Sequence, residues 1–253
     1  MNFFSVLRKE LMEQWRTKRV LVVAAVLVLF GLTSPLMAKI TPDLMKSIPG
    51  VPPEIASIIP TPTLADAILE YSGNMSQFGI LLALLMSMGA VAQEKERSTA
   101  SMMLTHPISR WTFLLAKFTA LSVAFAASLA LAGLGCWYYT LLLFEALPWG
   151  PFLAMNGLIL VVLLVYVAVT LLCSTLVRSQ GAAAGLAFAA LLLIGGVGSI
   201  PPISTYMPGR LFGWGRALAL GTSDPAWPAL WVSLGMIVAA LLVAWLVFRR
   251  QEL

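Results

Sequence analysis

Few side chains in this chain are of the types that carry out catalysis, and their spacing does not group them. There is one histidine, His106, and there are two cysteines, Cys136 and Cys173. The phosphate-binding pattern GxxxxGK[ST] and the metal-binding patterns HExxH and CxxC do not occur. The hydroxyl residues of the apolar runs have no base beside them, and an unactivated hydroxyl is a poor nucleophile. The residues therefore predict no catalytic or metal site, and both cysteines are interpreted as membrane-embedded thiols rather than a disulfide.

The segment with the most varied polar chemistry is 93–112, QEKERSTASMMLTHPISRWT. Its first charged residues, 94–97, are predicted to continue the preceding apolar helix without a break, and Pro107 is predicted to force a turn. Between them, three adjacent apolar residues at 102–104 lie on a small polar segment. This pattern favours contact with a protein partner; the alternative is packing against the chain's own helix ends.

Six runs without any charged residue separate these polar segments. They hold 19, 23, 27, 32, 31 and 24 residues, and a helix needs about 20 apolar residues to cross a bilayer core. The predicted fold is therefore an all-α polytopic membrane protein, one transmembrane domain over 1–253. The predicted spans are 20–38, 75–92, 113–144, 152–177, 181–200 and 229–248.

The distribution of basic residues predicts the orientation. With a cytoplasmic N-terminus, 12 Lys and Arg residues lie on the inner side and four, Lys39, Lys46, Arg210 and Arg216, lie outside. The positive-inside rule favours this arrangement, in which both termini are cytoplasmic. The net charge of +5 is thereby explained by topology and by attraction to lipid headgroups, and it predicts no nucleic-acid partner.

The segments outside the spans also have readable patterns. In 2–16, Phe3, Leu7, Leu11 and Trp15 recur every four residues, which predicts an amphipathic helix at the membrane interface. The proline-rich outer loop 39–73 is predicted to lie on the outer membrane face, with a short helix near 64–71 begun by a capping box. The outer segment 201–228 is predicted to be interfacial, with tryptophans at headgroup level.

Gly181 and Gly185 open the fifth span with a GxxxG spacing. Small residues at this spacing allow two helices to approach closely. Two readings stay open, which are ordinary packing within the chain and contact with a second subunit.

The inner segment resembles the permease subunits of type-2 ABC exporters. Their E-x-E-x-G-T-x-x-x-L-x-x-x-P-[IL]-S-R pattern is matched by Glu94-Lys95-Glu96-Arg97-Ser98-Thr99, Leu104 and Pro107-Ile108-Ser109-Arg110, with serine in place of the glycine. Leu114-Leu115-Ala116-Lys117 matches the family's L-L-x-[AG]-K, and Arg8-Lys9-Glu10-Leu11 before the first span is also typical. The six spans and inner termini agree along nearly the whole chain.

The resemblance implies a division of labour. A separate cytoplasmic ABC ATPase would bind ATP and Mg²⁺ and contact 93–112 and 177–181, while two permease chains, identical or different, would form the substrate path. Apart from Lys117 at the cytoplasmic end of the third span, the spans contain no charged residue, which counts against an ion-coupled carrier, so an external motor is expected. The residues that this reading assigns to ATPase coupling are Glu94, Glu96, Arg97, Met102, Met103, Leu104, Pro107, Arg110 and Arg178.

The cargo and the exact role stay open at this level. Family analogy favours efflux of drugs or antimicrobial peptides across the plasma membrane of a prokaryote. The alternatives are an ABC-type permease in a cofactor-maturation system, such as nitrous oxide reductase assembly, and a membrane scaffold that transports nothing.

Overall fold

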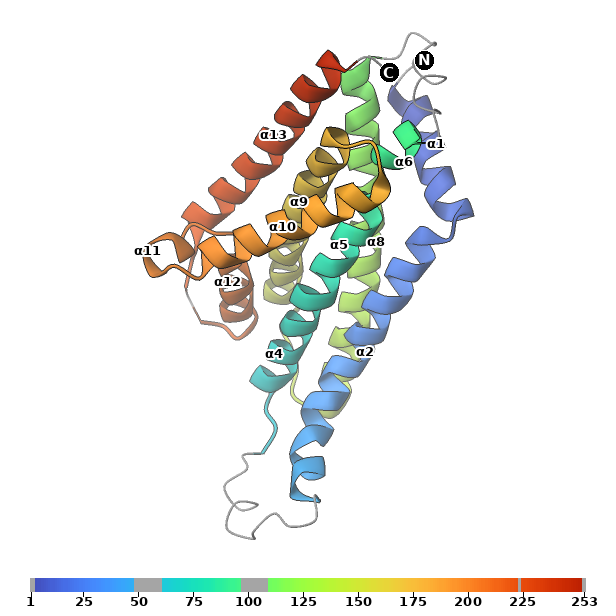
Figure 1. Cartoon of the computed structure of the whole chain (residues 1–253). Helices are drawn as coiled ribbons and strands as arrows, with labels where there is room; N and C mark the ends of the chain where they lie inside the picture. The colour runs from blue at the N-terminus through green and yellow to red at the C-terminus, as the bar shows by residue number, and fades with distance from the viewer. Residues whose placement is uncertain (1–2, 48–60, 97–108, 223, 252–253) are drawn as a thin grey trace.

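The computed structural model describes residues 3–47, 61–96, 109–222 and 224–251. Within these ranges the chain is helical, and six helices are long and apolar enough to span a membrane. The prediction of an all-α membrane protein with six spans is confirmed. Both termini lie at the same end of the bundle, together with α1 (Figure 1). We call this the terminal end.

Each spanning helix overlaps one of the uncharged runs, although the boundaries differ. The spanning helices are α2 (Arg19–Lys46), the composite of α4 (Leu64–Asn74), the π-helix η1 (Met75–Gly79), α5 (Ile80–Ser87) and α6 (Ala92–Glu96), then α8 (Arg110–Leu143), α9 (Trp149–Leu176), α10 (Gln180–Gly198) and α13 (Trp227–Arg250).

The helix α2 continues past the predicted end of the first span at 38 and runs to Lys46. Pro35 and Pro42 both lie inside this helix, and neither ends it. The hydroxyl and the N–H of Ser47 both bond to the carbonyl of Asp43, at 2.8 and 3.1 Å, and close the helix. The outer loop is therefore shorter than predicted, and most of it, 48–60, lies outside the described residues.

The capping box predicted before the second span is present. The backbone N–H of Thr63 donates to the Asp66 carboxylate at 2.8 Å, and α4 begins directly after it. This satisfies an N–H group that the helix itself cannot pair.

The core is built around α9, which is the most buried span. Within its most apolar stretch 67% of the residues are buried, against 11% for α10. Asn156 of α9 accepts a hydrogen bond from the buried Tyr71 hydroxyl of α4 at 2.6 Å. The helix α2 approaches α8 so closely at Gly31 that a β-carbon there would lie 2.3 Å from the carbonyl oxygen of Ala132.

The segment 201–228 is more deeply packed than predicted. After the short α11 (Pro201–Ser204), α12 (Arg210–Ala219) packs on α9, and Leu211 and Trp214 are buried. A β-carbon at Gly215 would lie 2.9 Å from the Met155 side chain, so glycine is what allows this contact. Trp227 is half-exposed, in keeping with the predicted headgroup-level position of the tryptophans.

The orientation of the bundle is open to a direct test, because both native cysteines are buried. We expect Ser101→Cys to resist a membrane-impermeant maleimide in intact cells and to react after permeabilisation. Thr61 is exposed and lies three residues before α4, which begins at the opposite end of the bundle (Figure 1). Thr61→Cys is therefore expected to react in intact cells. The reverse pattern would show that the predicted cytoplasmic location of the terminal end is wrong.

Candidate functional site

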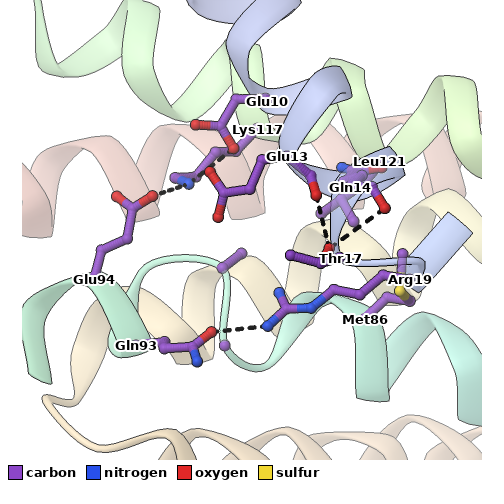
Figure 2. A pocket seen from close by; sticks show the side chains of 12 residues that line it. Glu10, Glu13, Gln14, Thr17, Arg19, Met86, Gln93, Glu94, Lys117 and Leu121 are labelled. Carbon is purple, nitrogen blue, oxygen red and sulfur yellow. Dashed lines mark hydrogen bonds and ion pairs between the residues drawn. The ribbon is translucent and has the colours of Figure 1, made fainter. Parts of the chain in front are cut away.

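A buried lysine joins three elements at the terminal end. Lys117 of α8 lies 3.0 Å from the carboxylate of Glu10 of α1 (Phe3–Arg16) and 2.7 Å from that of Glu94 of α6. The side chains of Lys117 and Glu10 are only 5% and 7% exposed. Figure 2 shows Glu94 and Glu10 converging on Lys117 from opposite sides. We call these three residues the Lys117 cluster.

Lys9 adds a second cation to the cluster. Its ammonium lies 3.1 Å from Glu10, 3.0 Å from Glu13 and 3.6 Å from Glu94. Burial alone would lower the pKa of Lys9, but the neighbouring Glu10, Glu94 and Glu13 outweigh it and raise this pKa above its usual value. Partial burial opposes the charge of Glu13 as well, yet its hydrogen bond with Lys9 lowers the pKa of that carboxyl.

The carboxylates of Glu10, Glu13 and Glu94 lie within 4.8 Å of one another, a grouping that could hold a metal ion. The ammonium groups of Lys9 and Lys117 already contact all three. These contacts balance most of the negative charge that would attract a cation. The arrangement is therefore best described as an ion-paired joint between helices rather than a metal centre.

The face that α1 turns to the protein lies beside its apolar stripe, of which Phe3 and Leu7 are partly buried against the protein. Val6, Glu10 and Gln14 are buried, and Val6 packs on Ala116 of α8. Trp15 is 64% exposed. The helix itself is confirmed, and its predicted position at the membrane interface stays a prediction that an exposed Trp15 supports.

A second set of contacts fixes α6 and α8 to the last turns of α9 and α13. Lys95 donates to the carbonyl of Thr175 at 2.6 Å and to the side chain of Gln251 at 2.5 Å. Arg110 donates to the carbonyls of Phe248, Arg249 and Gln251. A cation on the last carbonyls of a helix also opposes the helix dipole favourably.

The second span breaks just before α6, in contrast to the predicted unbroken helix. Residues 88–91 form turns, and Ser174 of α9 supplies the missing partners. Its hydroxyl donates to the carbonyl of Met88 at 2.8 Å and accepts from the N–H groups of Val91 and Ala92 at 3.1 and 2.9 Å. The break turns α6 so that Glu94 can reach Lys117.

Removing this hydroxyl is expected to loosen the break. Ser174→Ala leaves two buried N–H groups without their acceptor, and we expect a loss of about 1–3 kcal/mol of stability. Thermal unfolding in detergent would measure it. Ser122→Ala is the matched control, because Ser122 bonds within its own helix, to Phe118. Equal effects of the two changes would contradict the role assigned to Ser174.

The other predicted coupling residues fall in several places. Glu96 is exposed and accepts a hydrogen bond from the backbone N–H of Gln180 at the start of α10, at 3.3 Å. Arg178 is exposed in the turn between α9 and α10. Predictions for Arg97, Met102, Met103, Leu104 and Pro107 fall outside the described residues.

Gly181 and Gly185 are exposed on α10. A β-carbon at either position would meet no atom within 4 Å in the described part of the chain. This argues against packing within the chain as the reason for the GxxxG spacing. Contact with a second subunit is the reading that stays a prediction.

Glu10, Glu94 and Lys117 lie in three separate sequence motifs, and no ion pair between them was predicted from the sequence. Lys117 is 23 residues from Glu94 and 107 from Glu10. A signal was available, because charged residues next to apolar runs in three neighbouring elements need partners of opposite sign.

The fold and this joint define a multi-pass α-helical membrane protein whose buried charged residues, within the described ranges, are gathered at the terminal end. The chain belongs to the ABC-2 family of transporters, because the family model described as "ABC-2 family transporter protein" matches residues 4–253. It is also similar to the "Uncharacterized transmembrane protein YxlG" of Bacillus subtilis (strain 168), with 27% identity over 181 residues, which is 71% of this chain and 70% of that protein. The family supports a permease role for the chain, as the membrane component of a transporter that works with an ABC ATPase.

Proposed function

We propose that the chain is the permease subunit of an ATP-driven exporter in the plasma membrane of a prokaryote. A separate cytoplasmic ATPase binds ATP and Mg²⁺ and docks at the terminal end, and two permease chains form the substrate path. The sequence supports this division, because it contains no phosphate loop and no charged residue within its six apolar runs.

The observation that carries the proposal is the Lys117 cluster. The segment expected to receive the ATPase, 93–112, begins on α6 and returns into α8. Glu94 near its start and Lys117 beyond its end are bonded to each other at 2.7 Å, and Glu10 ties α1 to the same point. A force on the segment would therefore reach α8 and α1 together, as a rigid-body displacement requires.

Contacts of the same kind connect α6 to the remaining spans. Lys95 reaches the end of α9 and Glu96 reaches the start of α10. Arg110 holds the end of α13. The movement of two ATPase subunits as they close would thus be transmitted to most of the spanning helices. The bundle would then alternate between inward- and outward-facing states.

Co-purification tests this proposal. An ABC ATPase encoded beside this chain, expressed with it, is expected to co-purify in lipid nanodiscs, and its ATP hydrolysis is expected to rise with a transported substrate. A chain that purifies without any ABC ATPase partner would favour the scaffold alternative. If cells that have lost the export activity also lack one mature metalloenzyme, this result would favour the cofactor-maturation alternative.

A further inference from the structure

The elbow between α1 and α2 has the features of an anion site at the membrane surface. Lys18 adopts a left-handed backbone conformation, with φ 58° and ψ 10°, and α2 begins at Arg19 without a side-chain cap. The first N–H groups of a helix have no partner within it and carry the positive end of its dipole. Arg16 and Lys18 are exposed beside them, which adds positive charge at the level of lipid headgroups.

An apolar groove leads away from this elbow along the spans. It has a volume of about 230 Å³ and runs between α2 and α5. Val22, Val23, Leu82 and Leu85 line its apolar part, and Arg19 and Gln180 line its polar part. Because these apolar residues belong to spanning helices, the groove faces hydrocarbon along its length and headgroups at Arg19. This is the shape of a site for one acyl chain with its headgroup.

A smaller cavity continues the groove past Arg19 toward α1. It has a volume of about 40 Å³, room for a group the size of one water or one ammonium. Gln14 lines it, is only 8% exposed, and its side-chain oxygen has no hydrogen-bond partner in the described part of the chain. Figure 2 shows Gln14 and Arg19 lying near each other at this cavity. A buried acceptor without a donor is unfavourable, and a ligand donor would relieve it.

The charged side chains around the cavity differ in whether they still have a donor or an acceptor for a ligand. Glu10 and Glu94 are each paired with Lys117. Arg19 gives one nitrogen to Gln93 at 2.9 Å, and a guanidinium has further N–H donors for an anion. Glu13 lines the same cavity, is partly exposed, and pairs with Lys9 through one carboxylate oxygen at 3.0 Å, which leaves its other oxygen for a ligand. A ligand here would therefore find cationic donors at the elbow and acceptor oxygens, those of Gln14 and Glu13, on the inner side.

We propose that this groove binds one phosphatidylethanolamine molecule from the leaflet at the terminal end. The phosphate lies against Arg19 and the start of α2, the ammonium donates to Gln14 and faces Glu13, and one acyl chain lies along Val22 and Leu85. A headgroup with a phosphate and an ammonium satisfies both sides of the site, whereas a purely anionic headgroup leaves the acceptor side unpaired. The site makes no use of the ATPase or of the transported substrate, so it stands apart from the proposed function.

Phospholipid retained by the purified chain tests the proposal. The chain would be expressed in cells whose membrane holds phosphatidylethanolamine and phosphatidylglycerol, purified in mild detergent, and its bound lipid measured by mass spectrometry. We expect retained phosphatidylethanolamine in excess of its share of the membrane. Arg19→Gln is expected to lower this retention about fivefold, and Val22→Trp, which fills the groove, to abolish it.

Matched variants separate the site from general effects. Arg8→Gln and Leu21→Trp change exposed residues that line neither cavity, and they are expected to retain the lipid. Gln14→Leu should remove the preference for phosphatidylethanolamine over phosphatidylglycerol. Val22 is 56% exposed, so its replacement is compatible with folding even if Arg19→Gln is not. The proposal would be overturned if the wild-type chain retained lipids in the same proportions as the membrane. It would also be overturned if Val22→Trp retained as much lipid as the wild-type chain.

Discussion

Replacing Lys117 with methionine is expected to destabilise the chain by about 3–5 kcal/mol, the usual cost of removing one partner from a buried ion pair. The change keeps an unbranched side chain of similar length against the ring of Phe113. It removes the buried cation from the carboxylates of Glu10 and Glu94, while Lys9 still contacts both. Thermal unfolding of the purified chain, followed by size-exclusion chromatography, would measure the loss.

Two companion variants identify the cause. Lys9→Met removes a cation that is 38% exposed, and it is expected to cost about 1 kcal/mol or less. Adding Glu10→Gln and Glu94→Gln to Lys117→Met removes the uncompensated charges, and most of the stability should return. If this triple variant is as unstable as Lys117→Met alone, Lys117 stabilises the fold through the packing of its side chain rather than through its charge.

The double change Met103→Asp and Leu104→Asp is expected to release the ATPase while the chain stays folded in the membrane. Apolar anchors at the centre of an interface are worth about 2 kcal/mol or more each, so losing two lowers affinity by a factor of several hundred or more. The amount of ATPase that co-purifies with the chain from nanodiscs would show this.

A charge control belongs to the same experiment. Ser98→Asp with Ser101→Asp puts the same two negative charges into the segment 93–112 without removing an apolar anchor. We expect this control to keep most of its ATPase. If both double variants lose it equally, charge repulsion explains the release. If neither loses it, the contact must be sought on α1 or at residues 177–180.

The sequence was sufficient for the spans because a bilayer demands long apolar helices, and the uncharged runs mark each of them. Boundaries were harder to predict. The first span was predicted to end at 38 because Lys39 closes the uncharged run, yet α2 runs on to Lys46 with Pro42 inside it. The aromatic character of 210–219 suggested a position in the headgroup layer, whereas Gly215 lets α12 pack on α9.

The site was predicted only in part, because pairing depends on tertiary structure. The motif residues were recognised one by one, but nothing local to Glu94 predicts that it turns inward to Lys117 rather than outward to a partner. The turn that aims it arises at residues 88–91, and its hydrogen bonds come from Ser174, 83 residues from Val91. Likewise, Arg110 was assigned to the ATPase contact from its motif, while the structure shows its guanidinium on the last carbonyls of α13.

The central claim is that an ATPase drives this permease through the terminal end. ATP hydrolysis by the ATPase, reconstituted in lipid with the wild-type chain and with the Met103→Asp, Leu104→Asp chain, tests it most directly. We predict that the wild-type chain changes the rate of hydrolysis and makes it respond to added substrate, and that the double variant gives the rate of the ATPase alone. Equal, substrate-independent hydrolysis with either chain and without any chain would contradict the claim.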